Sequence, residues 1–161
     1  MEELIEDALR VRAASFQRHG VKVIRDYDPV PLITAERHKV MQIIANLAGN
    51  AKHAICDHRD TGGTVTLRLR GAGEDRICFE MTDDGIGISE ENLSKVFNFG
   101  FTTKTNGHGF GLHASALAAK EMGGTLIAES EGEGLGATFI LELPISQELP
   151  VDEPTVGVGK V

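Results

Sequence analysis

Apolar residues recur at helical spacing in three segments of the chain, residues 1–19, 35–58 and 110–121. In the longest of these segments, the residues that share one face are Val40, Ile43, Ile44, Leu47, Ala51 and Ile55. Thr34 is a suitable N-cap for this helix, and Gly123 and Gly124 end the third helix. The pattern predicts three main helices and a short fourth helix at residues 91–97.

Alternating apolar and polar residues predict five strands. The first covers residues 21–28, and TVTLRLR and RICFEMT, joined by GAGED, read as a hairpin at residues 64–82. Residues 125–144 contain two further strands around a glycine-rich turn. Because hairpins and helices are segregated along the chain, we expect an α+β fold. It should be a two-layer α/β sandwich, with a mixed, largely antiparallel sheet of about five strands covered on one face by about three helices.

Length and composition indicate one domain with a tail. The chain has 161 residues, 41% of them hydrophobic and 25% charged, and no apolar run reaches the roughly 20 residues of a membrane helix. A net charge of −8 with scattered basic residues argues against a nucleic-acid partner. Cys56 and Cys78 lack a disulfide or metal spacing, so we expect reduced thiols and a cytoplasmic setting. Residues 145–161 have no periodic pattern and are expected to be a poorly ordered tail or linker.

Three polar side chains share one side of the helix predicted at residues 35–58. A rotation of 100° per residue places Asn46, Asn50 and His53 within an arc of roughly 60°. Such asparagines either hydrogen-bond neighbouring backbone or present carbonyl oxygens to Mg²⁺ and phosphate, because hard cations prefer oxygen ligands. The helix alone leaves both interpretations open.

A carboxylate and two glycines follow the second hairpin strand, in the segment Asp83-Asp84-Gly85-Ile86-Gly87. An ionised carboxylate only accepts hydrogen bonds, so Asp83 suits an exocyclic amine such as that of adenine. Gly85 and Gly87 allow the backbone to approach a flat ligand closely. The alternative is an ordinary turn.

The segment NFGFTTKTNGHGFGLH carries glycines at positions 107, 109 and 111, directly before a predicted helix. It matches neither the P-loop spacing nor the dinucleotide fingerprint. Backbone N–H groups at a helix N-terminus hold phosphate oxygens without basic side chains, so the segment is either a phosphate cradle or a mobile surface loop.

Five motifs together carry a resemblance to a known family. NLAGNAKHA, DDGIGIS, FNFGFTTK, GHGFGLH and GLGATFILELP, in this order, resemble the N, G1, F, G2 and terminal glycine boxes of the histidine-kinase catalytic and ATP-binding domain. That domain shares a superfamily with DNA gyrase, heat-shock chaperone ATPases and MutL proteins. The resemblance covers roughly residues 20–144 and implies a Bergerat-type ATP-binding fold, with ATP and Mg²⁺ as cofactors.

The resemblance also implies roles for individual residues. Asn46 and Asn50 would contact phosphates, with Asn50 as the metal ligand and Asn46 in the catalytic centre. Asp83 would bind the adenine amine, with Gly85 and Gly87 close to the ring and Thr138 assisting through water. The remaining nucleotide-binding positions are Phe101, Thr102, Thr103 and Lys104 of a lid, and Gly107, His108, Gly109, Gly111 and Leu112 of the cradle. Lys104 would act catalytically as the cation on the terminal phosphate. His53, at a further nucleotide-binding position, stands where the family usually has Lys or Arg, and a neutral imidazole is a weaker phosphate partner than a fixed cation.

The resemblance further implies phosphoryl transfer. The hydrolases of the superfamily place a glutamate general base at the position of Asn46, and an asparagine cannot take a proton. None of the six histidines lies in an acceptor motif. We therefore expect the catalytic domain of a two-component sensor histidine kinase, with residues 1–19 as a linker helix from an upstream dimerisation domain that carries the acceptor. The expected partners are that domain and a response regulator, with a homodimer only in the full-length protein. The alternatives are an ATP-binding sensing or interaction module without transfer, and an ATP hydrolase.

Overall fold

The computed structural model describes residues 1–145 of the chain. The elements are α1 (Glu2–Arg10), α2 (Ala13–Arg18), β1 (Val21–Tyr27), α3 (Arg37–His58), β2 (Gly63–Ala72), β3 (Arg76–Asp83), α4 (Glu90–Leu93), α5 (Gly111–Glu121), β4 (Thr125–Glu129) and β5 (Ala137–Pro144). The tail predicted at residues 145–161 lies, apart from Ile145, outside the described residues.

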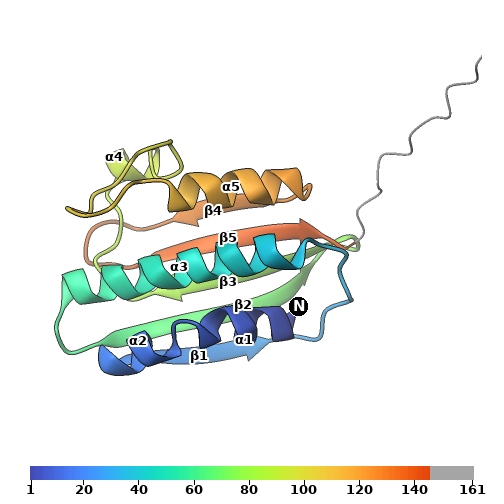
Figure 1. The fold of residues 1–161 in the computed structure, drawn as a ribbon, viewed down its shortest axis with the longest axis horizontal. Coiled ribbons are helices and arrows are strands. Elements are labelled where there is room, and N and C mark those ends of the chain that lie inside the picture. The colour runs from blue at the N-terminus through green and yellow to red at the C-terminus, as the bar shows by residue number, and fades with distance from the viewer. Residues whose placement is uncertain (146–161) are drawn as a thin grey trace, which may run out of the picture.

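The five strands form one mixed sheet in the order β1-β2-β3-β5-β4. β1 and β2 are parallel, since α3 connects them, and every other neighbouring pair is antiparallel. Helices α1, α2, α3 and α5 lie over the same face of the sheet (Figure 1). The predicted two-layer α+β sandwich with a mixed, largely antiparallel sheet is confirmed.

Three predicted helix boundaries were wrong. The short helix predicted at residues 91–97 covers only Glu90–Leu93. The N-terminal segment is not one helix, because the chain turns at Val11 and Arg12 between α1 and α2. Thr34 does not cap α3, which begins at Arg37 after Glu36. Thr34 instead donates its backbone N–H to the carbonyl of Ile145, 3.2 Å away, so this residue joins the loop before α3 to the end of β5.

The hydrophobic core lies between the helices and the sheet. Ile43, Ile44 and Leu47 of α3 meet Leu67 and Phe79 of the central strands, and all five are fully buried. Each such side chain contributes about 1.5–3 kcal/mol to the free energy of unfolding through its removal from water.

The N-terminal helices share this core. Ile5 and Leu9 of α1 and Phe16 of α2 are at most 4% exposed and belong to the same cluster as the α3 side chains. The division of the chain at residue 20 stays a prediction, but the first 19 residues shield one side of α3 from water.

The alternation of side chains along β3 and β5 positions a polar group beside α3. In β3 the buried residues are Ile77, Phe79, Met81 and Asp83. Asp83 therefore follows three apolar side chains on the helix-covered face, at the end of its strand. The register pairs it with Ala137, the first residue of β5.

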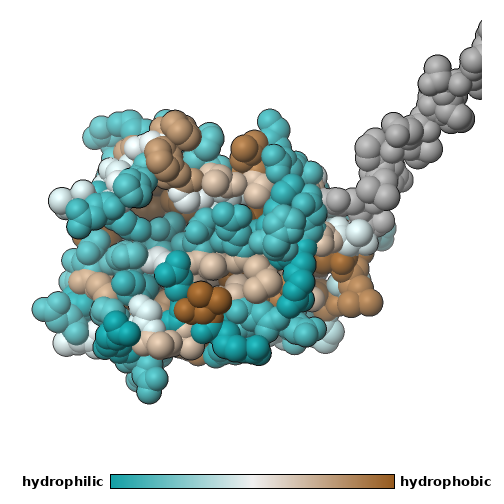
Figure 2. Space-filling view, viewed as in Figure 1, coloured by the Kyte–Doolittle hydropathy of each residue, from teal (hydrophilic) through white to brown (hydrophobic). Residues whose placement is uncertain are grey.

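The surface on the helix side is mostly hydrophilic in the space-filling view (Figure 2). Exposed apolar side chains include Phe99 and Phe110 beside the start of α5 and Leu117 on that helix. Among the described residues, none of the helices combines the length and apolar character that a bilayer crossing requires.

Candidate functional site

A cavity of about 650 Å³ opens beside α3 and is bounded by the segment after β3, the loop before α5 and the start of β5. It contains most of the residues singled out in the sequence. Those that line it are Asn50, Asp83, Gly87, Phe101, Thr102, Thr103, Lys104, Gly107, His108, Gly109, Gly111 and Leu112. Asn50 and Leu112, 62 positions apart in the sequence, thus meet at one site.

Asp83 provides a buried acceptor in this cavity. Its side chain is 4% exposed, and its Oδ1 accepts a hydrogen bond of 2.9 Å from the backbone N–H of Gly85. Burial raises the pKa of this carboxyl to about 6, against the opposing effect of N–H groups at Gly85 and Ala137. The carboxylate is therefore mainly ionised at pH 7, with capacity for a further donor.

The two glycines after Asp83 are required by the close approach of backbone segments. A Cβ at Gly85 would lie 2.5 Å from the carbonyl carbon of Ala54 on α3, and Ile86 donates its N–H to the Ala54 carbonyl at 2.9 Å. Gly85 itself does not line the cavity. Gly87 has a φ of +73°, and a Cβ there would overlap the carbonyl of Gly132 in the turn before β5.

Two glycines join the ends of the loop before α5. Gly100 donates its N–H to the carbonyl of Gly109 at 3.0 Å. Gly109 has a φ of +70°, and a Cβ there would stand 2.6 Å from the carbonyl oxygen of Phe101. The residues between these glycines therefore form a loop with adjoining ends, which carries Phe101 through Lys104 to the cavity.

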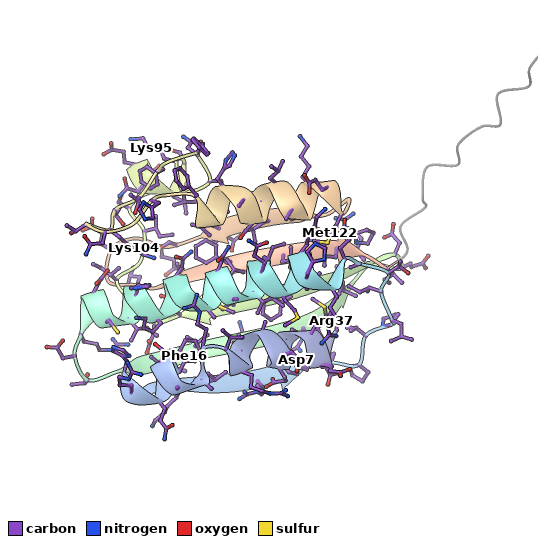
Figure 3. The ribbon with its side chains drawn as sticks, in the orientation of Figure 1. Asp7, Phe16, Arg37, Lys95, Lys104 and Met122 are labelled. Carbon is purple, nitrogen blue, oxygen red and sulfur yellow. The ribbon has the colours of Figure 1, made fainter. Side chains whose placement is uncertain are left out.

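Lys104 extends from this loop to α3 (Figure 3). Its ammonium nitrogen donates to Asn50 Oδ1 at 2.8 Å. Burial lowers the pKa of Lys104, as do the positive charges of Lys52 and Arg12, while Asp57 opposes the shift. The predicted lid lysine and the predicted metal ligand are thus direct hydrogen-bond partners.

The phenylalanines of the loop have three separate roles. Phe97 is partly buried and meets the ring of Phe139 edge-on, with centroids 6.5 Å apart. Phe99 is 72% exposed and stacks on Phe110 at 4.8 Å. Phe101 lines the cavity.

Two predicted contact residues of α3 do not line the cavity. Asn46 Nδ2 donates to Ser115 Oγ at 3.2 Å and to the Gly111 carbonyl at 3.4 Å, so this side chain joins α3 to the start of α5. His53 donates Nδ1–H to the carbonyl of Gly49 on its own helix, at 2.7 Å. Partial burial, together with the charges of Lys104 and Lys52, lowers the pKa of His53, so the ring is mainly neutral at pH 7.

The prediction for Thr138 needs correction. Its hydroxyl shares a 2.9 Å hydrogen bond with that of Thr82, the residue opposite it on β3. Because side chains alternate along a strand, Thr138 points to the other face of the sheet, while its neighbours Ala137 and Phe139 line the cavity.

Sequence reasoning missed several lining residues. The apolar ones are Ala54, Ile86, Ile88, Val96, Phe110, Ala137 and Phe139, and the polar ones are Asp57, Ser89, Asn92 and Glu133. Ala54 and Asp57 had a detectable signal, because they lie four and seven residues after Asn50 and therefore on the same face of α3. The others depend on how loops and strands approach the helix, which no local pattern encodes.

Comparison with known proteins gives consistent matches. Residues 35–147 match the sequence profile of the family described as histidine kinase-, DNA gyrase B- and HSP90-like ATPase. The sensor protein FixL of Bradyrhizobium diazoefficiens is 33% identical, over 92% of this chain and 29% of its own length. The sensory histidine kinase/phosphatase NtrB of Rhizobium meliloti is 34% identical, over 94% of this chain and 42% of its own. The solved catalytic domain of the histidine kinase ThkA, in a nucleotide-free form, is 25% identical with a TM-score of 0.79, over 91% of this chain and 93% of that one.

The fold and the cavity beside α3 define the class as a two-layer domain of the histidine-kinase catalytic type. The chain belongs to the histidine kinase-, DNA gyrase B- and HSP90-like ATPase family, since the profile match covers most of its length. The resemblance inferred from the five motifs is therefore confirmed. The chain spans less than half the length of these curated relatives.

Proposed function

We propose that this chain is the ATP-binding catalytic domain of a two-component sensor histidine kinase, acting on the cytoplasmic side of the cell. It would transfer the γ-phosphoryl group of ATP to a histidine on a dimerisation domain of the same protein. That histidine would then donate the phosphoryl group to a response regulator. The observation that carries the proposal is that one cavity contains both the buried acceptor Asp83 and the hydrogen-bonded residues Asn50 and Lys104.

The arrangement along α3 supports a binding direction for the nucleotide. Asp83 lies at the end of the cavity where Gly85 and Ile86 contact Ala54. Asn50 precedes Ala54 by one helical turn, a rise of about 6 Å. An adenine amine bound by Asp83 would therefore direct the phosphates toward Asn50 and the N-terminus of α5.

The residues of the cavity fit a magnesium ion. Asn50 Oδ1 already accepts a cationic donor, and the Asp57 carboxylate lines the same cavity on the same face of α3. Carbonyl and carboxylate oxygens are the ligands that Mg²⁺ prefers, together with phosphate oxygens. When bound, the ion would neutralise charge on the phosphates, and Lys104 would be released from Asn50 to contact the terminal phosphate.

The remaining groups would orient and shield the phosphates. The first N–H groups of α5, beginning at Gly111, have no partners within the helix and carry the positive end of its dipole. Phe101 and the loop closed by Gly100 and Gly109 would exclude water from the transferring group.

Transfer is favoured over hydrolysis because Asn46 is not a base. Its amide nitrogen donates to Ser115 and Gly111, which leaves a neutral side chain that cannot accept a proton from water. A second candidate, ATP hydrolysis, is favoured by one observation, the Asp57 carboxylate in the cavity wall. Steady phosphate release that is lost in Asp57→Asn would support that alternative.

The test of the proposed function is phosphoryl transfer with separated components. These 161 residues should bind Mg·ATP in calorimetry, fail to label themselves with radioactive γ-phosphate, and label a supplied dimerisation domain that carries the acceptor histidine. Asp83→Asn should abolish both binding and labelling. Strong self-labelling of these residues alone, or Mg·ATP binding without any transfer to the supplied acceptor, would contradict the proposal; the second result would favour a nucleotide-sensing module.

A further inference from the structure

An arginine from the N-terminal segment lies against the helix that carries the site. Arg12 occupies the turn between α1 and α2, as the residue before the first turn of α2. Its Nη2 and Cζ atoms lie 3.4 and 3.5 Å from the point where a Cβ of Gly49 would stand. Gly49 is part of α3 between Asn46 and Asn50, and its missing side chain leaves room for the guanidinium on the helix surface.

The guanidinium of Arg12 has no partner among the described residues. Its Nε is buried and makes no hydrogen bond, and none of its nitrogens forms an ion pair within residues 1–145. Arg10, two residues earlier, is paired with Asp7 at 3.1 Å. A buried N–H donor without an acceptor is unfavourable, and Arg12 as a whole is only partly buried, so its guanidinium is available to an anion.

Arg12 lies beside the stretch of α3 that carries Asn50. The α3 residues that line the cavity are Asn50, Ala54 and Asp57, and Gly49 directly precedes the first of them. On a helical wheel with Asn46 at 0°, Asn50 lies at about +40°, His53 at about −20° and Gly49 at about −60°. Arg12 covers the Gly49 side of this arc, and Lys104 contacts the Asn50 side. The charge of Arg12 is close enough to Lys104 to contribute to the lowered pKa of that lysine. Two cations thus flank one stretch of α3, and no carboxylate within residues 1–145 is bonded to either.

His53 cannot supply the charge in this arc. Its Nδ1–H is held by the Gly49 carbonyl, so the neutral ring presents only the unprotonated Nε2 to its surroundings. A nitrogen lone pair repels a phosphate oxygen, whereas a guanidinium offers a planar set of donors that matches it.

We propose that Arg12 binds the terminal phosphate of the nucleoside triphosphate and provides the fixed positive charge that His53 lacks. This inference rests on the proposed ATP-binding function. With adenine at the Ala54 end of the cavity, the terminal phosphate is the one that reaches furthest toward Asn46 and Gly49. Arg12 thereby makes the turn between α1 and α2 sensitive to whether the third phosphate is present.

The test compares nucleotides that differ in that phosphate. Calorimetry of Mg·ATP, Mg·ADP and adenosine binding is performed on the wild type, Arg12→Gln, Arg12→Lys and the control Arg10→Gln. Arg10 is the matched control because it lies on the same segment, and its side chain is 77% exposed and paired with Asp7. Arg12→Gln should weaken ATP binding about tenfold or more and leave ADP and adenosine within about twofold. Arg12→Lys should keep part of the preference for ATP, and Arg10→Gln should behave as the wild type.

The outcomes separate this inference from the proposed function. Equal losses for ATP, ADP and adenosine in Arg12→Gln would indicate a packing role on Gly49 and would overturn the inference, as would unchanged ATP affinity. Suppose that the wild type binds ATP, that Asp83→Asn abolishes this binding, and that Arg12→Gln binds ATP as tightly as the wild type. Then the proposed function stands and only the role of Arg12 is wrong. If the wild type binds no nucleotide, the proposed function fails and the inference fails with it. Thermal unfolding without nucleotide checks that each variant is folded.

Discussion

The ammonium nitrogen of Lys104 lies 2.8 Å from Asn50 Oδ1, so the loop before α5 is bonded directly to α3 across the cavity. The two residues are 54 positions apart in the sequence. Burial lowers the pKa of Lys104, which means that this ammonium has given up part of its hydration. The hydrogen bond to an uncharged amide compensates for that loss incompletely, and a phosphate would compensate better.

Replacement of this lysine should therefore weaken phosphate binding selectively. Lys104→Ala should lower the affinity for Mg·ATP about tenfold, because a charge-assisted hydrogen bond is lost, and leave adenosine affinity unchanged. The measurement is calorimetric titration with both ligands. Lys95→Ala serves as a control, since Lys95 is paired with Glu91 on the surface at 2.9 Å. Equal loss of adenosine binding would show that Lys104 acts on the shape of the loop.

Asp83 should make the free energy of unfolding depend on pH. The pKa of this carboxyl is raised from 3.8 to about 6 in the folded chain, so the folded state holds the proton more tightly than the unfolded state. The resulting stabilisation is complete below pH 3.8 and is lost as the pH rises through about 6, with a limit of about 3 kcal/mol. The difference between denaturant unfolding curves of the wild type and Asp83→Asn, measured from pH 4 to pH 7.5, isolates this contribution. A difference that does not change with pH would contradict the raised pKa.

Adenosine affinity should change in the opposite direction with pH. The ionised carboxylate of Asp83 accepts a hydrogen bond from an amine more strongly than the protonated acid does, so binding should strengthen as the pH rises through about 6. Between pH 5 and pH 7 the wild type should gain up to about tenfold in affinity, the limit set by the ionised fraction of a group with this pKa. Asp83→Asn should bind weakly at both pH values.

The glycines before α5 should differ in their tolerance of alanine. Gly109→Ala should lower the free energy of unfolding by at least about 1–2 kcal/mol, because an alanine is strained at a φ of +70° and its Cβ would overlap the Gly100 and Phe101 carbonyls. Gly111→Ala is the matched control. The nearest atom to its added Cβ would be 3.8 Å away, so the change in stability should be less than about 1 kcal/mol. Denaturant unfolding of the two variants measures this difference. Equal stability would refute the role of the Gly100–Gly109 contact in holding the ends of the loop together.

Asn46 and Ser115 should act as a pair. Their hydrogen bond of 3.2 Å joins α3 to α5, and Ser115 is buried. A double-mutant cycle of Asn46→Ala and Ser115→Ala should give a coupling energy of about 0.5–1.5 kcal/mol in unfolding experiments. Additive effects would indicate that Asn46 is held mainly by the Gly111 carbonyl.

Some of this site was accessible from local patterns alone. The helical period of residues 35–58 places Asn46, Asn50 and His53 on one side of α3. The strand before Asp83 predicts a carboxylate at its end. The same reasoning would have excluded Thr138, because Phe139, Leu141 and Leu143 alternate on the inner face of β5 and leave Thr138 on the other.

Other features depend on distances between segments that the sequence does not encode. The turn between α1 and α2 contains neither Gly nor Pro, so nothing local predicted that the N-terminal helix would break there. Whether Asn46 faces the cavity or Ser115 depends on how closely α5 approaches α3. Local propensity cannot report that distance, because packing of the whole core determines it.

By itself the sequence determined the class of fold, the order of its elements and the motifs that assign the family, since hydrophobic periodicity and glycine positions reflect local backbone geometry and burial. The tertiary structure alone decided that Lys104 contacts Asn50 and that Arg12 lies on Gly49. These contacts join residues 54 and 37 positions apart, so they form only when the sheet order and helix packing bring their segments together.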